Sequence, residues 1–129
     1  MKIIVVGCTP VAQTAVDYIK TTGVEVVGII NLHYELSRNK ANYTIVQGID
    51  WKDILFCKDI NSQETIDWIS DREPDIIFQL GWSQIFKKKI LNLPKLFCMG
   101  THPSPLPVGR GAAILNWKLI EGKECLWGS

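Results

Sequence analysis

The chain has 129 residues, the length of one ordinary domain, so we expect a single hydrophobic core. Fourteen Lys and Arg against thirteen Asp and Glu give a formal net charge of +1, which argues against a broad phosphate-binding surface for nucleic acid. A composition that is 47% hydrophobic and 21% charged is typical of globular proteins and excludes the disordered and fibrous classes.

The first half of the sequence alternates between strand-like and helical periods. Residues 2–7 form a β-branched run of the kind that is buried on both faces of a parallel sheet. Apolar residues at helical spacing follow from Val11, and Thr21-Thr22-Gly23 is expected to close that helix. Residues 24–30 predict a second strand, residues 31–53 a polar loop, and residues 54–57 a short third strand.

The middle of the sequence predicts a helix and a fourth strand. Asn61, with Glu64 three residues later, resembles a capping box that opens a helix ending before Pro74. Residues 75–80 then predict a strand that stops at Gly81.

The last third predicts two helices around a fifth strand. Residues 85–91 give a short amphipathic helix, and residues 96–99 give a strand. A Pro- and Gly-rich loop follows, and residues 112–121 predict a final helix with Gly122 at its C-terminal cap. The alternation predicts an α/β fold: a Rossmann-like, open, mostly parallel, doubly wound sheet of about five strands with flanking helices. Ligands bind such sheets at the carboxyl ends of the strands, which directs attention to the loops at 7–10, 81–83 and 100–111.

The cysteines and the apolar runs indicate a cytoplasmic protein without membrane contact. Cys8, Cys57, Cys98 and Cys125 form no Cys-x-x-Cys pair and lie in or beside apolar runs, so we interpret them as buried free thiols and expect no metal site. The longest apolar runs are far too short to span a bilayer, and the N-terminus has no signal-peptide pattern.

The first loop argues against a nicotinamide cofactor. In a Gly-x-Gly-x-x-Gly fingerprint the second glycine lets the backbone approach the pyrophosphate, and Thr9 occupies that position here. Pro10 removes an amide donor, and Asn31 stands where a ribose-binding carboxylate is expected. We therefore expect no NAD; a tight strand-to-helix turn explains Gly7 and Pro10 equally well.

The segment from Gly100 to Ala113 carries the most specific information. His102 directly follows a predicted strand, and Pro103, Pro105 and Pro107 make the loop around it stiff. We assign His102 a chemical role; the structural alternative is a histidine hydrogen-bonded within a turn. Arg110 places a cation just before the next helix.

This segment resembles the loop Asn-x-His-Pro-Ser-x-Leu-Pro-x-x-Arg-Gly-Ala-Ala of the folate-dependent formyltransferases, and differs from it only at the first residue, which is Gly100. Gly7-Cys-Thr-Pro10 resembles the first loop of that family, and Leu80-Gly81-Trp82 falls at its folate-site strand end. The family includes glycinamide ribonucleotide transformylase, methionyl-tRNA formyltransferase and the sugar-amine N-formyltransferases. The similarity covers essentially residues 1–129, which we interpret as the family's N-terminal, catalytic-type domain.

The resemblance implies transfer of a formyl group from N10-formyltetrahydrofolate to a primary amine. It assigns polarisation of the formyl oxygen to His102, and contact with the folate to Leu80, Gly81, Trp82, Leu106 and Pro107. Thr9, Pro10 and Arg110 are the expected contacts of the acceptor substrate. For Trp82 the alternative is packing at the rim of the sheet, and Ser104 is interpreted as a turn residue that bonds to nearby backbone.

Two departures from the family bear on activity. Gly100 replaces the family's catalytic Asn, and the family's catalytic Asp lies beyond Ser129, so we interpret the chain as incomplete at its C-terminal end. Loss of such a general base costs roughly 10²- to 10⁴-fold in rate.

The leading hypothesis is formyl transfer to an amino group on a nucleotide-linked sugar. The expected partners are therefore the small-molecule folate and an amine, without nucleic acid, and a homo-oligomer stays open. The alternatives are a non-catalytic folate- or nucleotide-binding module and an inactive fragment of such an enzyme. Methionyl-tRNA is disfavoured as the acceptor by the near-zero net charge.

Overall fold

The structure is a computed structural model that describes residues 1–104, 106–111 and 114–122. The chain divides into two compact units, residues 1–99 and residues 100–129, and each is described by itself. Pro105, Ala112, Ala113 and Cys125, which the sequence analysis names, lie outside the described residues, as do the other residues from 123 to 129.

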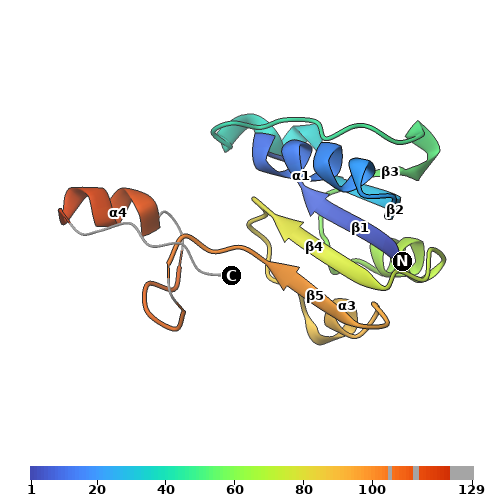
Figure 1. Ribbon diagram of the computed structural model, residues 1–129. Coiled ribbons are helices and arrows are strands. Elements are labelled where there is room, and N and C mark those ends of the chain that lie inside the picture. Colours follow the sequence, from blue (N-terminus) through green and yellow to red (C-terminus); the bar gives the residue numbers. More distant parts are fainter. Residues whose placement is uncertain (105, 112–113, 123–129) are drawn as a thin grey trace. The chain divides into compact units, whose positions relative to one another are not determined.

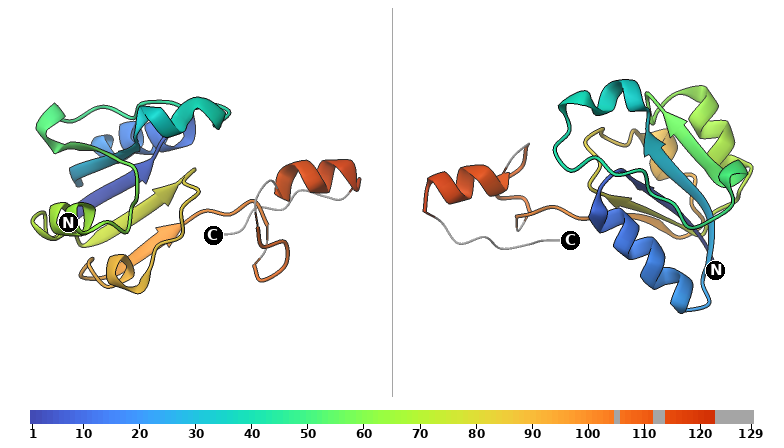
Figure 2. Two further views of the ribbon diagram at one scale, coloured as in Figure 1. Left: turned by 180° about the vertical axis from the view of Figure 1, so that it is seen from behind. Right: turned by 90° about the horizontal axis from the view of Figure 1, so that it is seen from above.

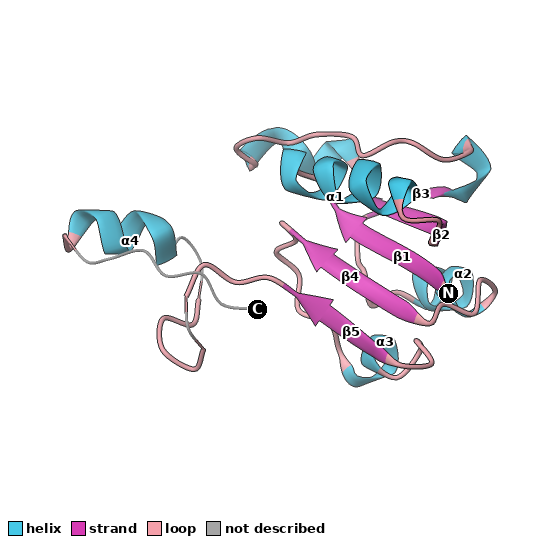
Figure 3. Cartoon of the chain, viewed as in Figure 1, coloured by secondary structure: helices cyan, strands magenta, loops and turns pink. Residues whose placement is uncertain are grey.

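The centre of the fold is a five-stranded sheet with the strand order β3-β2-β1-β4-β5. Its strands are β1 (Lys2–Gly7), β2 (Glu25–Leu32), β3 (Ile54–Cys57), β4 (Ile76–Leu80) and β5 (Phe97–Gly100). The pairs β1–β2, β1–β4 and β2–β3 are parallel, and β5 points the same way as β4 (Figures 1 and 3). The prediction of an open, parallel, doubly wound sheet is confirmed.

Helices cover both faces of this sheet (Figure 2), which is why residues 3–6 of the central strand β1 are all apolar and buried. Helix α1 (Pro10–Thr21) packs Ala12 and Val16 on one face. Helix α2 (Gln63–Ser70) packs Ile69 on the other, beside the short helix α3 (Lys88–Leu91). The predicted first helix and the strand at 54–57 are confirmed, and β2 continues two residues beyond its predicted end.

The irregular segments are tied to the sheet by amide side chains. The buried Asn31 bonds to both backbone groups of Val46, donating to its oxygen at 3.0 Å and accepting from its nitrogen at 2.8 Å. Gln13 bonds to both backbone groups of Gln47 in the same way. The polar stretch at 31–53 is thus held in place, and it contains two short 3₁₀ helices, η1 (Tyr34–Asn39) and η2 (Trp51–Asp53).

The hydrogen bonds of Asn61 correct two predictions. Asn61 does not cap α2; Ser62 does, with its Oγ accepting from the Thr65 nitrogen. Asn61 instead bonds to the Ile85 oxygen and the Lys87 nitrogen, at 3.0 and 2.8 Å. Because these bonds hold residues 85–87 in an irregular conformation, the helix predicted from residue 85 begins only at Lys88.

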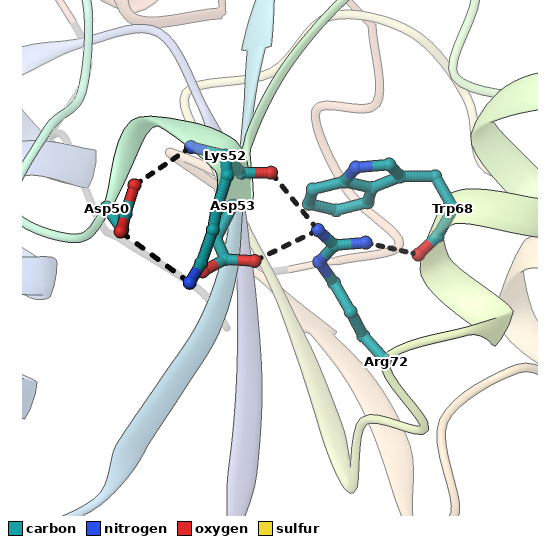
Figure 4. A network of polar contacts seen from close by, with 5 residues as sticks. All are labelled: Asp50, Lys52, Asp53, Trp68 and Arg72. Carbon is teal, nitrogen blue, oxygen red and sulfur yellow. Dashed lines mark hydrogen bonds and ion pairs between the residues drawn. The ribbon is translucent and has the colours of Figure 1, made fainter.

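A network of polar contacts lies at the amino-terminal ends of the strands (Figure 4). The Arg72 guanidinium lies 3.5 Å from the Trp68 ring centroid and donates to the Trp68 oxygen and to Asp53. A Cβ atom on Gly28 would lie 2.7 Å from the Trp68 ring, so the sequence places glycine where the indole crosses β2.

The second unit begins at the end of β5 and contains helix α4 (Ile114–Ile120). Gly122 follows it with a φ of +64° and donates its N–H to the Leu119 oxygen, so the predicted C-terminal cap is confirmed. Among the helices of the described residues, none has the length and apolar character needed to cross a bilayer.

Candidate functional site

The strand order places two of the predicted loops at the switch point of the sheet. β1 and β4 are neighbours, while the chain leaves β1 toward β2 and β3 on one side and continues from β4 to β5 on the other. In open α/β sheets the crevice at such a point, outside the carboxyl ends of the strands, is where ligands bind. The loops after Gly7 and after Leu80 both lie there.

The turn after β1 is tight because Gly7 leaves no room for a side chain. A Cβ on Gly7 would meet the Ala12 side chain and would lie 2.5 Å from the Leu80 carbonyl oxygen. Pro10 then occupies the first turn of α1, and the Thr9 side chain makes no capping hydrogen bond to it. The turn therefore brings β1, α1 and β4 as close together as their backbones allow.

Thr9 and Gly81, which the sequence analysis assigned to the acceptor and the folate, contact each other across the switch point. Gly81 has a φ of +65°, and a Cβ on it would collide with the Thr9 side chain. The Thr9 Oγ1 atom is buried without a hydrogen-bond partner among the described residues. A buried hydroxyl of this kind can still bond to a ligand atom.

The side chains of Leu80 and Trp82 point into the core. Each is 8% exposed, and Trp82 packs among Cys8, Ile60 and Ile90. Its backbone oxygen accepts from Gln79, while its indole Nε1 is buried without a partner among the described residues. Ligand contact by Leu80 and Trp82 would therefore use their backbone groups, with the exposed Gly81 between them.

Lys40 joins this site, and the sequence analysis did not name it. Its Nζ atom lies 3.7 Å from the Cys8 Sγ and 5.8 Å from the centroid of the Trp82 ring. The stretch around Lys40 has no period, so the sequence contains no signal that would bring this ammonium group to the carboxyl ends of β1 and β4.

The thiols of Cys8 and Cys57 are buried, as predicted, whereas that of Cys98 is only partly buried; all three are free. Burial raises the pKa of the Cys57 thiol to about 11 and also raises that of Cys98. Cys57 lines a recess of about 310 Å³ at the carboxyl end of β3, and none of the predicted site residues lines it. The described residues contain no group of three metal-ligating side chains.

Burial of Cys57 predicts a loss of stability at alkaline pH. The thiol ionises near pH 9 in the unfolded chain and near pH 11 in the folded one, so the folded chain keeps the proton longer. The free energy of unfolding should be insensitive to this group below pH 9 and should fall by about 2 kcal/mol by pH 11. Urea unfolding at several pH values measures it, with Cys57→Ala as the control that lacks this slope; equal slopes in both proteins would contradict the assignment.

In the second unit, His102 is held by its own loop. Its Nε2 lies 2.8 Å from the Gly109 carbonyl oxygen. Since a carbonyl only accepts, Nε2 carries a proton, and no hydrogen bond joins Nδ1 to the described residues. This is the turn hydrogen bond named above as the structural alternative, and it leaves one ring nitrogen for chemistry.

The rest of this loop is fixed by Ser104. Its buried Oγ donates to the Val108 oxygen at 2.7 Å, so its interpretation as a turn residue is confirmed. Gly109, with a φ of +70°, has no room for a Cβ beside that hydroxyl. Leu106, Pro107 and Arg110 are exposed on this loop.

The predicted site residues therefore form two sets. Thr9, Pro10, Leu80, Gly81 and Trp82 meet at the switch point of residues 1–99, whereas the second set, His102, Leu106, Pro107 and Arg110, shares the loop that follows β5. Two buried polar atoms of the first set, Thr9 Oγ1 and Trp82 Nε1, lack partners among the described residues.

Comparison with known sequences identifies the family. A family model described as formyl transferase matches residues 1–126. A methionyl-tRNA formyltransferase of Clostridium perfringens is 44% identical over 64 residues, which is 50% of this chain and 21% of that protein. The bifunctional polymyxin resistance protein ArnA of Wigglesworthia glossinidia brevipalpis is 31% identical over 127 residues, 96% of this chain and 19% of that protein. The chain thus spans about a fifth of the length of these relatives.

Solved structures of formyltransferases share the fold. The phosphoribosylglycinamide formyltransferase of Bacillus halodurans superposes with a TM-score of 0.66 at 16% identity, over 94% of this chain and 66% of that one. A 4-N formyltransferase of Francisella tularensis superposes with a TM-score of 0.65 at 20% identity, over 98% of this chain and 48% of that one. The family match over nearly the whole sequence, together with the loops described above, shows that the chain belongs to the formyl transferase family.

Proposed function

We propose that this chain binds N10-formyltetrahydrofolate and serves the transfer of its formyl group to a primary amine. The observation that carries the proposal is the family match over residues 1–126, which includes both sets of predicted site residues. In this reaction the amine attacks the formyl carbon, the bond from that carbon to N10 breaks, and charge develops on the formyl oxygen in between.

Each set of residues has a part in the proposal. At the switch point, the backbone of Leu80, Gly81 and Trp82 binds the folate, while Thr9 and Pro10 contact the acceptor. On the second loop, His102 polarises the formyl oxygen or relays a proton, Leu106 and Pro107 add apolar contact with the folate, and Arg110 attracts an anionic part of the acceptor.

We further propose that the acceptor is an amino group on a nucleotide-linked sugar. The similarity to ArnA extends over 96% of the chain, whereas that to the methionyl-tRNA formyltransferases covers about half of it. A second candidate, a folate-binding module without catalysis, is favoured by Gly100, which lacks the amide that the resemblance implies at this position.

The experiment that tests the proposal is binding of a stable N10-formyltetrahydrofolate analogue to the 129-residue chain, measured by calorimetry and by tryptophan fluorescence. We expect saturable binding at one site, together with a change in tryptophan fluorescence. The Trp82→Phe variant should lose this fluorescence change. The Trp68→Phe variant should keep it, because Trp68 lies at the amino-terminal end of the sheet. Absence of binding by the folded chain would overturn the proposal. Binding without turnover of any amino sugar would support the non-catalytic module.

A further inference from the structure

The recess at the end of β3 lies on the same edge of the sheet as the switch point, although none of the predicted site residues lines it. The strands β1 to β4 are parallel, so the carboxyl end of β3 shares this edge with those of β1 and β4. Two strand spacings, about 10 Å, separate β3 from β1. The volume of about 310 Å³ is at the small end of the range for ligand-binding cavities.

The floor of this recess is apolar and uncharged. Leu55 and Cys57 both line it, and both belong to the hydrophobic cluster on the face of the sheet that α2 covers. The Cys57 thiol keeps its proton at neutral pH, because burial raises its pKa to about 11. The floor therefore suits an uncharged group that can pack against carbon and sulfur.

The charged side chains around the recess disfavour an anion inside it. Asp59 and Glu64 line the recess and are exposed. Lys58 lines it as well, but its ammonium group forms an ion pair with Glu35. A phosphate or carboxylate in the recess would thus meet two carboxylates and a cation that is already paired, whereas a neutral ring would meet no such repulsion.

Phe56 lines the recess with its backbone. Its side chain packs in the cluster on the other face of the sheet, where its ring stacks on Trp51. The Cys57 oxygen accepts from the His33 nitrogen at the end of β2, so this carbonyl points toward β2. Successive peptide groups of a strand point to opposite sides, so the N–H and the carbonyl of Phe56 point away from β2. Among the described residues no strand pairs with β3 on that side, which leaves a donor and an acceptor side by side.

His33 adds an aromatic side chain to the wall of the recess. Its Nδ1 accepts from the Glu35 nitrogen at 3.4 Å, and its ring centroid lies 4.4 Å from that of Tyr34. These two contacts hold the imidazole from its own chain segment. An aromatic ring held in this way can stack on a flat ligand, as aromatic side chains do on the bases of nucleic acids.

The floor, the charges, the backbone pair and the imidazole together select a flat, uncharged ring that carries a hydrogen-bond donor beside an acceptor. A nucleobase has this pattern along its edge, and the small volume favours a base with one ring. We propose that the recess at the end of β3 binds the base of the nucleotide-linked sugar, and that the base is a pyrimidine. This rests on the proposed function, which supplies the acceptor.

The position of Lys40 agrees with the direction that such an acceptor would take. Its ammonium group lies beside the Cys8 thiol at the end of β1, between β3 and β4 in the order of the strands, and forms none of the ion pairs among the described residues. The ribose and two phosphates of the acceptor are long enough to bridge two strand spacings. With the base in the recess, the phosphates would pass Lys40 and the sugar amine would reach the switch point.

The test is binding of UDP to the 129-residue chain without folate, measured by calorimetry. We expect saturable binding at one site and weaker binding of ADP, whose base has two rings. UDP that is methylated at N3 of the uracil should bind at least about fivefold more weakly, because the methyl group removes the donor for the Phe56 carbonyl. This comparison changes the ligand alone and leaves the fold of the chain untouched.

Variants locate the site. His33→Asn keeps an acceptor near the Glu35 nitrogen but removes the ring, and should weaken UDP binding at least about fivefold. Cys57→Met places a larger side chain in the recess and should abolish binding, with urea unfolding as the check on its fold. Tyr18→Leu is the matched control, because Tyr18 is a 70% exposed aromatic residue on α1, which covers the other face of the sheet. It should bind UDP as the parent chain does.

Four results would overturn the proposal: no binding of UDP by the folded chain, equal affinity for the N3-methylated ligand, unchanged affinity in both recess variants, or an equal loss in Tyr18→Leu. Binding of ADP as tightly as UDP would overturn the choice of a pyrimidine. If the folate analogue binds and UDP does not, the base site fails while the proposed formyl transfer stands. If UDP binds in the recess and the folate analogue does not bind, the base site is supported and its part in formyl transfer is overturned.

Discussion

Replacing His102 by alanine is expected to lower the rate of formyl transfer by roughly 10²- to 10⁴-fold, the usual contribution of a positioned acid or base. The expectation follows from the proposed function and from Nδ1, the ring nitrogen that the hydrogen bond of Nε2 to the Gly109 oxygen leaves for the reaction. Single-turnover transfer from N10-formyltetrahydrofolate, with the chain in excess over the folate, measures it. Binding of the stable folate analogue should change by only a few-fold.

The hydrogen bond to Gly109 makes His102→Gln the decisive comparison. A glutamine can place an N–H near the position of Nε2 and so keep the loop closed, but it has no ring nitrogen to exchange a proton. We expect His102→Gln to be as slow as His102→Ala. Recovery of the rate by glutamine would show that His102 only holds the loop, and the chemical role would be wrong.

A control separates the histidine from the loop around it. Ser104→Ala removes the bond to the Val108 oxygen and leaves the imidazole in place. If the loop serves mainly to hold His102, this variant should lose less than about tenfold in rate, since a single neutral hydrogen bond contributes only about 1 kcal/mol. A loss as large as that of His102→Ala would move the functional role from the imidazole to the loop.

The strands could be predicted because their signal is local. The apolar runs at 2–7, 54–57 and 75–80 contain few polar residues, and a strand buried on both faces requires just that composition. The alternation of such runs with helical spacing predicts the fold class. The general geometry of parallel sheets then places the loops after β1 and β4 at one rim, where the structure has them.

The irregular segments could not be predicted because side chains far apart in sequence hold them. Asn31 pairs with Val46, and Asn61 pairs with Ile85 and Lys87. An amide that bonds to the backbone of a distant segment leaves no period in the sequence, and an asparagine three residues before a glutamate looks like a helix cap. The hydrogen bonds of the Asn61 amide to Ile85 and Lys87 explain both wrong predictions, the capping box at Asn61 and the helix start at residue 85.

The net charge indicates whether the chain is basic overall, but it does not show how the charges are distributed along the sequence. A value of +1 argues against a molecule that is basic overall, yet residues 76–120 carry only positive charges. The position of Lys40 beside Cys8 and Trp82 shows the same limit, because the ammonium group reaches the switch point through a segment whose course is set by Asn31 and Gln13.

Replacing Gly7 by alanine should destabilise the fold by about 3 kcal/mol, at the upper end of the usual cost of overpacking. The added Cβ would meet the Ala12 side chain on one side and lie 2.5 Å from the Leu80 carbonyl oxygen on the other, so neither α1 nor β4 can give way alone. Urea unfolding measures the change. Gly23→Ala is the control: its φ is +75° but nothing lies within 4 Å, so it should cost only about 1 kcal/mol of backbone strain.

A double-mutant cycle shows which neighbour is responsible and links stability to the site. Adding Ala12→Gly to Gly7→Ala removes the clash with the side chain and leaves the one with the Leu80 oxygen. If the contact with the Leu80 oxygen dominates, Ala12→Gly should restore little of the lost free energy of unfolding. The added Cβ then strains the junction of β1 and β4, where Thr9 contacts Gly81. In that case the double variant should bind the folate analogue more weakly than the parent chain, even under conditions in which the variant is fully folded. Full rescue of stability and binding together would show that the close approach of α1, rather than that of β4, sets the geometry of the switch point.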